Sequence, residues 1–413
     1  MERTTIASAP SGHAAHAAGA AGWGVFAGFS ASLVGIGLAR FAYTPLLPAI
    51  VDAHWFAASR AAYLGAANLA GYLAGALAGR ALAARVGSAR TLRAMMLLAS
   101  LAFFACARPV DFAWFFSWRF LAGLAGGALM VLAAPAVLPR VKPSRRGLAG
   151  GVIFMGVGVG VAASGTLVPL LLQQGLARTW CGLGAISLLL SLAAWRAWPT
   201  SKTPAQAQAT HHAAGHAPPT AVLRALFVEY GLNAAGWVPH MILLVDFIAH
   251  GLGRGLQVGA EYWVLFGLGA TAGPILSGMF ADRVGFIRAL RMAFMLEALG
   301  VALPALSSSS PWLMVSSLLV GAFVTGTVPL VLGRVHELLE HHPARQGPAW
   351  RTATVCFALL QAVSAYAMSW VFARSAGDYQ LLFGMGAVAL LLALAIDLTV
   401  ARRVTRLRSL PEG

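Results

Sequence analysis

The sequence has few charged residues and very few acidic ones. Of its 413 residues only 10% are charged, with 13 Asp and Glu against 29 Lys and Arg, whereas 59% are hydrophobic. A soluble domain carries about 25% charged residues, and no soluble architecture has enough interior to bury so much apolar sequence. The composition therefore excludes a soluble globular protein and predicts a polytopic membrane protein.

Cysteine and known catalytic patterns are also scarce. Cys106, Cys181 and Cys356 each lie in or beside an apolar segment with no CxxC spacing, as is typical of small buried hydrophobic residues. The sequence has no Walker loop for ATP and no GxSxG or HExxH pattern. These absences argue against an enzyme and against a primary pump, and we expect no cofactor and no catalytic metal.

The basic excess gives a net charge of +16, which raises the question of nucleic-acid binding. Such a protein gathers its basic residues on one face, whereas here they recur in small groups between apolar runs. Basic cytoplasmic loops of a membrane protein explain the charge better, so we expect no nucleic-acid partner.

Twelve apolar segments are long enough to span a bilayer, which takes about 20 residues. The chain divides into two groups of six at the polar, Pro/Ala/His-rich residues 199–219, which we interpret as a mobile cytoplasmic linker. The histidines of that linker, between His211 and His216, could instead bind metal. The predicted organisation is a disordered tail (1–21), six-helix bundles (22–198 and 220–402) and a cytoplasmic tail (403–413). The predicted spans are 22–50, 60–84, 91–107, 112–138, 147–173, 178–198, 222–250, 259–281, 287–306, 311–335, 348–373 and 378–401.

The arginines and lysines indicate the orientation. With the N-terminus inside, 22 of them fall on the inner side and five on the outer side, and two, Arg40 and Arg119, lie within spans. Because basic residues concentrate in cytoplasmic loops, we expect both termini in the cytoplasm.

The two halves resemble each other in sequence. Pro45 and Asp52 of the first span match Pro239 and Asp246 of the seventh at an offset of 194 residues. The same offset relates residues 135–141 of the fourth span to residues 329–335 of the tenth. These ordered matches indicate a duplication, and repeated halves are how many secondary transporters are built.

A glycine-bounded loop motif recurs after the second span of each half. The second copy is Gly278, Asp282, Arg283 and Gly285; the first keeps Arg85, Gly87 and Arg90 but has Ala84 in place of the Asp. With twelve spans as six plus six, this chain resembles the major facilitator superfamily. In that family the Asp meets a neighbouring helix N-terminus and helps to hold the cytoplasmic gate closed. The departure at Ala84 predicts a weaker latch in the first half.

Two further segments are similar to patterns of this superfamily. Arg119 and Gly123 match its Arg-x-x-x-Gly motif, and the glycines from Gly151 to Gly165 resemble its antiporter motif, although the expected proline is absent. The stretch GIGLARFAYTPLLP, residues 35–48, resembles the first helix of the YbfB/YjiJ-like branch. The resemblance implies an all-α fold of two pseudo-symmetric six-helix bundles, a bacterial inner-membrane location, and a monomer.

The first span carries the strongest candidate for a substrate site. Helical spacing places Arg40, Tyr43 and Thr44 on one face, and a charge inside a bilayer normally faces a cavity or a partner. Pro45 and Pro48 lack the N–H that a helix needs, so we expect a kink there. The alternative is that Arg40 only locks helices together.

The seventh span carries a second polar stripe, made of Glu229, Asn233 and His240, with Pro239 predicted to bend the helix beside it. Glu229 and His240 can bind and release protons, which predicts a proton relay; the alternative is that Glu229 is solvated near the cytoplasmic interface. Asp246 is assigned to an outer gate or to a solvated helix end. For Glu297, in the middle of span 287–306, we expect a structural hydrogen bond.

These observations predict a secondary active transporter that moves a small organic solute by alternating access and is driven by protons. Arg40 and Arg119 favour an anionic or polar solute. The alternatives are a drug or metabolite exporter that exchanges its substrate for protons, and a membrane sensor that keeps the fold without transport.

Overall fold

The structure is a computed structural model that describes residues 12–56, 58–199, 220–375 and 378–408. Within these ranges the chain is helical and contains no strand. Nearly all of the predicted linker, with its histidines, lies outside them. Where it is described, the polypeptide confirms the predicted all-α class.

The predicted first span is interrupted, and the other five spans of the first half are single helices. The first span consists of α1 (Gly12–Ser32), the π-helix η1 (Leu33–Leu38) and α2 (Tyr43–Asp52). The next five are α3 (Ala58–Val86), α4 (Ser88–Ala105), α5 (Phe112–Val137), α6 (Arg146–Leu172) and α7 (Leu176–Ala193). The short 3₁₀ turns η2 (Leu138–Arg140) and η3 (Pro143–Arg145) join α5 to α6.

The second half repeats this plan. Its first span is again interrupted and consists of α8 (Thr220–Gly236), α9 (Val238–Asp246) and the π-helix η4 (Phe247–Gly251). The others are α10 (Leu256–Val284), α11 (Phe286–Leu306), α12 (Ser310–Leu338), α13 (Pro343–Arg374) and α14 (Tyr379–Arg408). Several helices run past the predicted spans: α1 begins at Gly12, within the expected N-terminal tail, and α14 ends at Arg408, within the expected C-terminal tail.

Ten helical segments of the described chain are long and apolar enough to cross a membrane. The two predicted spans that are not among them are helical but fail for different reasons. The seventh is divided at Trp237 into pieces of 17 and nine residues. The second, α3, is long but rich in Ala and Gly and carries three arginines.

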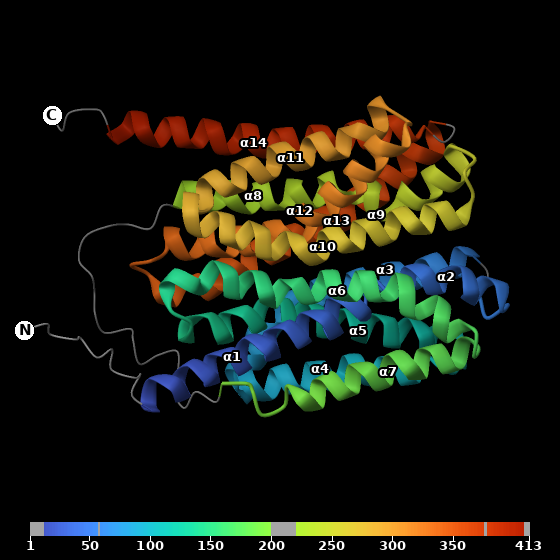
Figure 1. The fold of residues 1–413 in the computed structure, drawn as a ribbon, viewed down its shortest axis with the longest axis horizontal. Coiled ribbons are helices and arrows are strands. Elements are labelled where there is room, and N and C mark those ends of the chain that lie inside the picture. Colours follow the sequence, from blue (N-terminus) through green and yellow to red (C-terminus); the bar gives the residue numbers. More distant parts are fainter. Residues whose placement is uncertain (1–11, 57, 200–219, 376–377, 409–413) are drawn as a thin grey trace, which may run out of the picture.

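The helices of the two halves form two layers with their axes nearly parallel (Figure 1). At one end of the bundle α1 begins, α7 ends, α8 begins and α14 ends, as an even number of spans in each half requires (Figure 1). We call this end the basic end. It also holds the two motif loops, where Gly87 and Gly285 adopt φ values of 94° and 86°. Only glycine adopts such values readily, so the two copies of the motif share their backbone turn.

The outer surface and the interior have opposite polarity. Large apolar side chains such as Leu189 (67% exposed) and Leu299 (58%) face outward, whereas Arg119, Asn233 and Glu297 are buried among the helices. Polar groups are expensive in lipid and collect inside membrane proteins. The candidate site is therefore in the interior.

Candidate functional site

The first span breaks at residues 39–42, and the sequence explains why. Pro45 lies in the first turn of α2 and has no N–H for the carbonyl of Phe41, which accepts instead from the N–H of Thr44 at 3.2 Å. On the other side of the break, η1 packs closely on two helices: a Cβ on Gly35 would collide with Leu129 of α5, and one on Gly37 with the backbone of Gly156 and Gly160 of α6. The π-helix before the break is thus held against both helices. Pro48 lies within α2, and its side chain is outside the described part of the structure.

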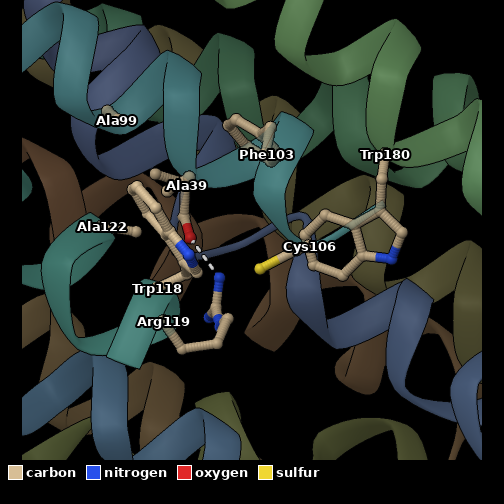
Figure 2. Close-up of a pocket in the computed structure, with 9 residues that line it drawn as sticks. Ala39, Ala99, Phe103, Cys106, Trp118, Arg119, Ala122 and Trp180 are labelled. Atoms are coloured by element: carbon tan, nitrogen blue, oxygen red, sulfur yellow. Dashed lines mark hydrogen bonds between the residues drawn. The ribbon is translucent and has the colours of Figure 1, made fainter. Parts of the chain in front are cut away.

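Arg119 of α5 holds this break from within the first half. Its Nη1 donates to the carbonyl of Ala39 at 2.7 Å, and its guanidinium lies 4.3 Å from the centre of the Tyr43 ring. Figure 2 shows it beside a small cavity, lined also by Cys106, Phe103 and Trp180. The Nε of Arg119 has no partner among the described residues. Arg119 therefore supports span 1 and does not reach the other half.

Arg40 lies at the boundary between the halves. Its Nη2 donates to Oε1 of Gln361 on α13 at 2.6 Å and contacts the sulfur of Met241 on α9 at 3.5 Å. The guanidinium also lies 5.7 Å from the ring centre of Tyr72 on α3. Among the side chains that the structure describes, no carboxylate pairs with it. A half-buried cation here joins spans 1, 7 and 11 and has no counter-ion among the described residues.

Tyr43 and Thr44 do not share the direction of Arg40. Tyr43 is buried under Arg119, and Thr44 is exposed. Helical spacing predicted a common face, but that spacing holds only along a continuous helix, and the break intervenes between Arg40 and Tyr43. The structure thus separates the three residues.

The helices α8 and α13, near Arg40 at the boundary, carry a cluster of aromatic side chains that the sequence analysis did not single out. Tyr230 of α8 lies between Trp350 and Phe357 of α13, with ring centres 6.1 and 4.7 Å away, and Trp237 packs 6.2 Å from Phe357. The indole N–H of Trp350 donates across the boundary to the carbonyl of Met130 at 3.2 Å. Tyr230 and Trp237 are seven residues apart on one helical face, a spacing that could have revealed them.

Three buried polar atoms in this cluster have no partner in the described chain: Nε2 of Gln361, the hydroxyl of Tyr230 and Nε1 of Trp237. All three can donate a hydrogen bond, and the Arg40 guanidinium, which contacts Gln361, is also a donor. Unsatisfied buried donors are rare in folded proteins and call for an explanation. A ligand rich in acceptor oxygens matches them.

The polar stripe of span 7 faces away from Arg40, into the second half. Asn233 donates from Nδ2 to Oε2 of Glu297 on α11 and accepts from the hydroxyl of Thr327 on α12 at 3.2 Å. The expected hydrogen bond of Glu297 is thereby confirmed. Nε2 of His240 lies 2.8 Å from Oγ of Ser316, also on α12.

Glu229 is buried one turn before Asn233, and its electrostatic neighbours are Asp397, Arg334 and Arg291. The side chain of Asp246, at the end of α9, is outside the described part of the structure. Pro239 lies in the first turn of α9, two residues after Trp237, where the span is interrupted.

The described residues contain no group of three His, Cys, Asp or Glu that could hold a metal ion. The boundary between the halves thus offers a cation, hydrogen-bond donors and aromatic walls, which can bind a small molecule through its acceptors.

The sequence of residues 32–398 matches the family described as "Uncharacterised MFS-type transporter YbfB", where MFS stands for major facilitator superfamily. The chain belongs to this family. The match confirms the predicted superfamily and branch, and it makes the protein an integral, multi-pass MFS transporter. A comparison with curated proteins gave no match.

Solved MFS structures share the fold. The human organic anion transporter MFSD10 (TETRAN) superposes with a TM-score of 0.71 at 19% identity, covering 91% of this chain and 98% of that one. The fucose:proton symporter FucP of E. coli, in the outward conformation, gives 0.69 at 13% identity, with 90% and 97% covered. The proton:xylose symporter XylE gives 0.71 at 12% identity, with 92% and 96% covered. At these identities the likeness establishes the fold.

The loop motif of this MFS transporter differs between its two copies. Asp282 accepts from the N–H of Leu148 at 3.2 Å and lies against the backbone of Gly147, in the first turn of α6. A carboxylate at a helix N-terminus is favourable. Gly278 contacts Gly147, and Arg283 is exposed.

In the first copy, where Ala84 replaces the acid, Arg85 and Arg90 are exposed and Arg80 lies against Gly347 in the second turn of α13. Arg351, on the same helix, donates to the carbonyl of Leu77 at 3.4 Å. The first copy of the motif therefore places the Arg80 cation near the N-terminus of α13, which is the positive end of that helix.

Proposed function

We propose that this MFS transporter is a secondary active carrier of a small organic anion, which it binds at Arg40 between the two halves and moves together with protons. The observation that carries the proposal is the position of Arg40. It comes from the first half, is held by Gln361 of the second half, and has no carboxylate partner among the described side chains.

The chemistry of the surrounding groups supports an anionic solute. A guanidinium binds carboxylates and phosphates through paired hydrogen bonds, and the nearby unsatisfied donors add capacity for acceptor oxygens. The aromatic rings of Tyr72, Tyr230 and Trp237 supply apolar walls, as small-molecule sites usually have. These side chains are at most 3% exposed, so a solute needs the halves to separate before it can enter.

The position of the site also suits alternating access. Arg40 contacts both halves, so separation of the halves on either side of the membrane exposes it to that side. Proton coupling draws support from the ionisable groups of the second half, Glu229, His240 and Glu297, which lie on or beside span 7.

The glycine-rich α6 gives no separate support to drug export. Gly151 and Gly158 lie against the backbone of α10, whereas Gly156 and Gly160 lie against the first span. Their role is close packing on two sides of one helix, which a carrier of any substrate class can use.

A thermal-shift panel on the purified protein tests the proposal. Each carboxylate is paired with its neutral amide, for example succinate with succinamide and 4-hydroxybenzoate with 4-hydroxybenzamide, in mildly acidic and mildly alkaline buffer. A ligand that binds the folded protein stabilises it, by about 2.7 kcal/mol at a concentration of 100 Kd. We expect carboxylates to raise the Tm of the wild type to a pH-dependent extent, and amides to have no effect.

The matched variants are Arg40→Ala and Arg178→Ala, the latter at an exposed arginine in α7. The carboxylate response should vanish in Arg40→Ala and persist in Arg178→Ala. Equal responses to carboxylates and amides, or a full response in Arg40→Ala, would contradict the proposal.

A further inference from the structure

Glu297 is a carboxyl group in the middle of the membrane with half of its hydrogen-bonding capacity unused. It lies near the centre of α11 and is 0% exposed. Oε2 accepts from the amide of Asn233, whereas Oε1 has no partner among the described residues. An ordinary structural hydrogen bond does not need an acid here, because glutamine would also accept from Asn233.

Among the described residues, no cation pairs with Glu297. On the helices packed around Glu297, the titratable groups at the basic end already have partners or lie apart: Arg291 of α11 pairs with Asp397 of α14, and Arg334 of α12 pairs with Glu337. Glu229 of α8 lies among these groups, and His240 of α9 lies toward the opposite end. At the level of Glu297, α12 contributes the hydroxyl of Thr327. An unpaired charge is expensive in a dry interior, so in this conformation Glu297 holds a proton.

His240 provides a second proton acceptor on the same side of span 7. The hydroxyl of Ser316 donates to the carbonyl of Gly300 at 2.7 Å, so Nε2 of His240 must be the donor in its contact with that hydroxyl. Nδ1 is then the bare nitrogen, and it has no partner in the described chain. Orphaned buried atoms of this kind are where internal water is expected.

We propose that Glu297 is the group that binds the coupled proton, in a site inside the second half that is separate from Arg40. The inference rests on the proposed function. The step is a proton transfer from hydronium to Oε1: an O–H bond of hydronium breaks and leaves water, and the new O–H bond turns the carboxylate into a neutral acid. Loss of the proton leaves a carboxylate at Glu297, which needs further hydrogen-bond donors or water. Deprotonation therefore requires a more open packing of the helices around Glu297.

Span 7 connects the proton site to the solute site. Asn233 of α8 holds Glu297, and Met241 of α9, directly after His240, contacts Arg40. A change in packing around Glu297 therefore acts on the same span whose second part, α9, contacts Arg40. The break at Trp237 lies between these two contacts and lets the two parts of the span move by different amounts.

Infrared spectroscopy of the full-length protein in lipid tests proton binding without any solute. The wild type should show the C=O stretch of a protonated carboxylic acid at neutral pH, and this band should diminish in alkaline buffer. Glu297→Gln should lose the band, Glu297→Asp should keep a titrating band at a shifted frequency, and Glu340→Gln, at an exposed position, should match the wild type. Persistence of the whole band in Glu297→Gln, or a wild type without the band, would overturn the assignment.

Coupling is tested with spin labels at Ser88→Cys and Ala344→Cys, exposed positions at the basic end of each half, after replacement of the three native cysteines. In the wild type the distance distribution should shift between acidic and alkaline buffer. Glu297→Gln should give the acidic distribution at both pH values, while Glu297→Asp restores the shift. A shift in Glu297→Gln as large as in the wild type would refute the coupling role. Because neither experiment contains a solute, both can succeed even if the thermal-shift panel finds no anion.

Discussion

At the scale of single residues, the charged side chains inside the bundle differ in their partners. Arg119 donates to a carbonyl of its own half, Arg40 donates to a side chain of the other half, and Glu297 accepts from an amide. The sequence identifies both arginines as charges within apolar runs. It could not separate their roles, because the break at residues 39–42 ends the regular rotation on which a helical-face argument depends.

Replacement of Arg119 should reduce stability and leave solute selection intact. Arg119→Met removes the donor that satisfies the carbonyl of Ala39, and a hydrogen bond to a charged group contributes about 1.5–3 kcal/mol. We expect a lower Tm with an undiminished thermal shift by carboxylates. A variant with wild-type stability that no longer responds to carboxylates would place the anion site at Arg119.

At the scale of elements, close backbone packing of α6 sets the boundary between the halves. Gly151 and Gly158 face α10, where a Cβ would collide with backbone atoms of Pro274 and Ala270 respectively. The sequence indicated that this span is unusually rich in glycine, but a single chain does not say what each glycine faces. The two interrupted spans, by contrast, follow from Pro45 and Pro239, which the sequence places at matching positions.

Two matched glycine substitutions test the role of the close contact between α6 and α10. Gly158→Ala adds a methyl group against the α10 backbone, and such overpacking costs about 1–3 kcal/mol. Gly384→Ala, in α14, adds the same group to open space and should gain up to about 1 kcal/mol of helix propensity. Thermal unfolding in detergent should give a lower Tm than the wild type for Gly158→Ala only. Equal Tm values would show that α6 and α10 are packed less closely than described.

At the scale of the whole molecule, the two latches at the basic end are unequal. Asp282 faces the start of α6, whereas the corresponding position in the first half is Ala84, near an Arg80 that lies against α13. The sequence predicted both the six-plus-six organisation and this difference, because each rests on local motifs. The cluster at Arg40 joins spans 1, 7 and 11, and no local pattern reports such distant contacts.

Substitutions at Ala84 and Asp282 should change the balance between conformations that are closed and open at the basic end. Ala84→Asp adds a negative charge near the positive end of α13, which is worth about 0.3–1 kcal/mol, and should favour closure at the basic end. Asp282→Asn should favour opening there. The labels at residues 88 and 344 report both effects as shorter and longer distances, respectively. Shifts of the same sign in the two variants would contradict the assigned latch roles.

The most direct test of the central claim is uptake by proteoliposomes of the labelled carboxylate that gives the largest thermal shift, compared with a labelled organic cation, under a proton gradient. The wild type should accumulate the carboxylate and exclude the cation. Arg40→Ala should lose tenfold or more of the carboxylate uptake, because a charge-assisted hydrogen bond is worth about 1.5–3 kcal/mol. Equal uptake of anion and cation by the wild type and by Arg40→Ala would contradict an anion site at Arg40.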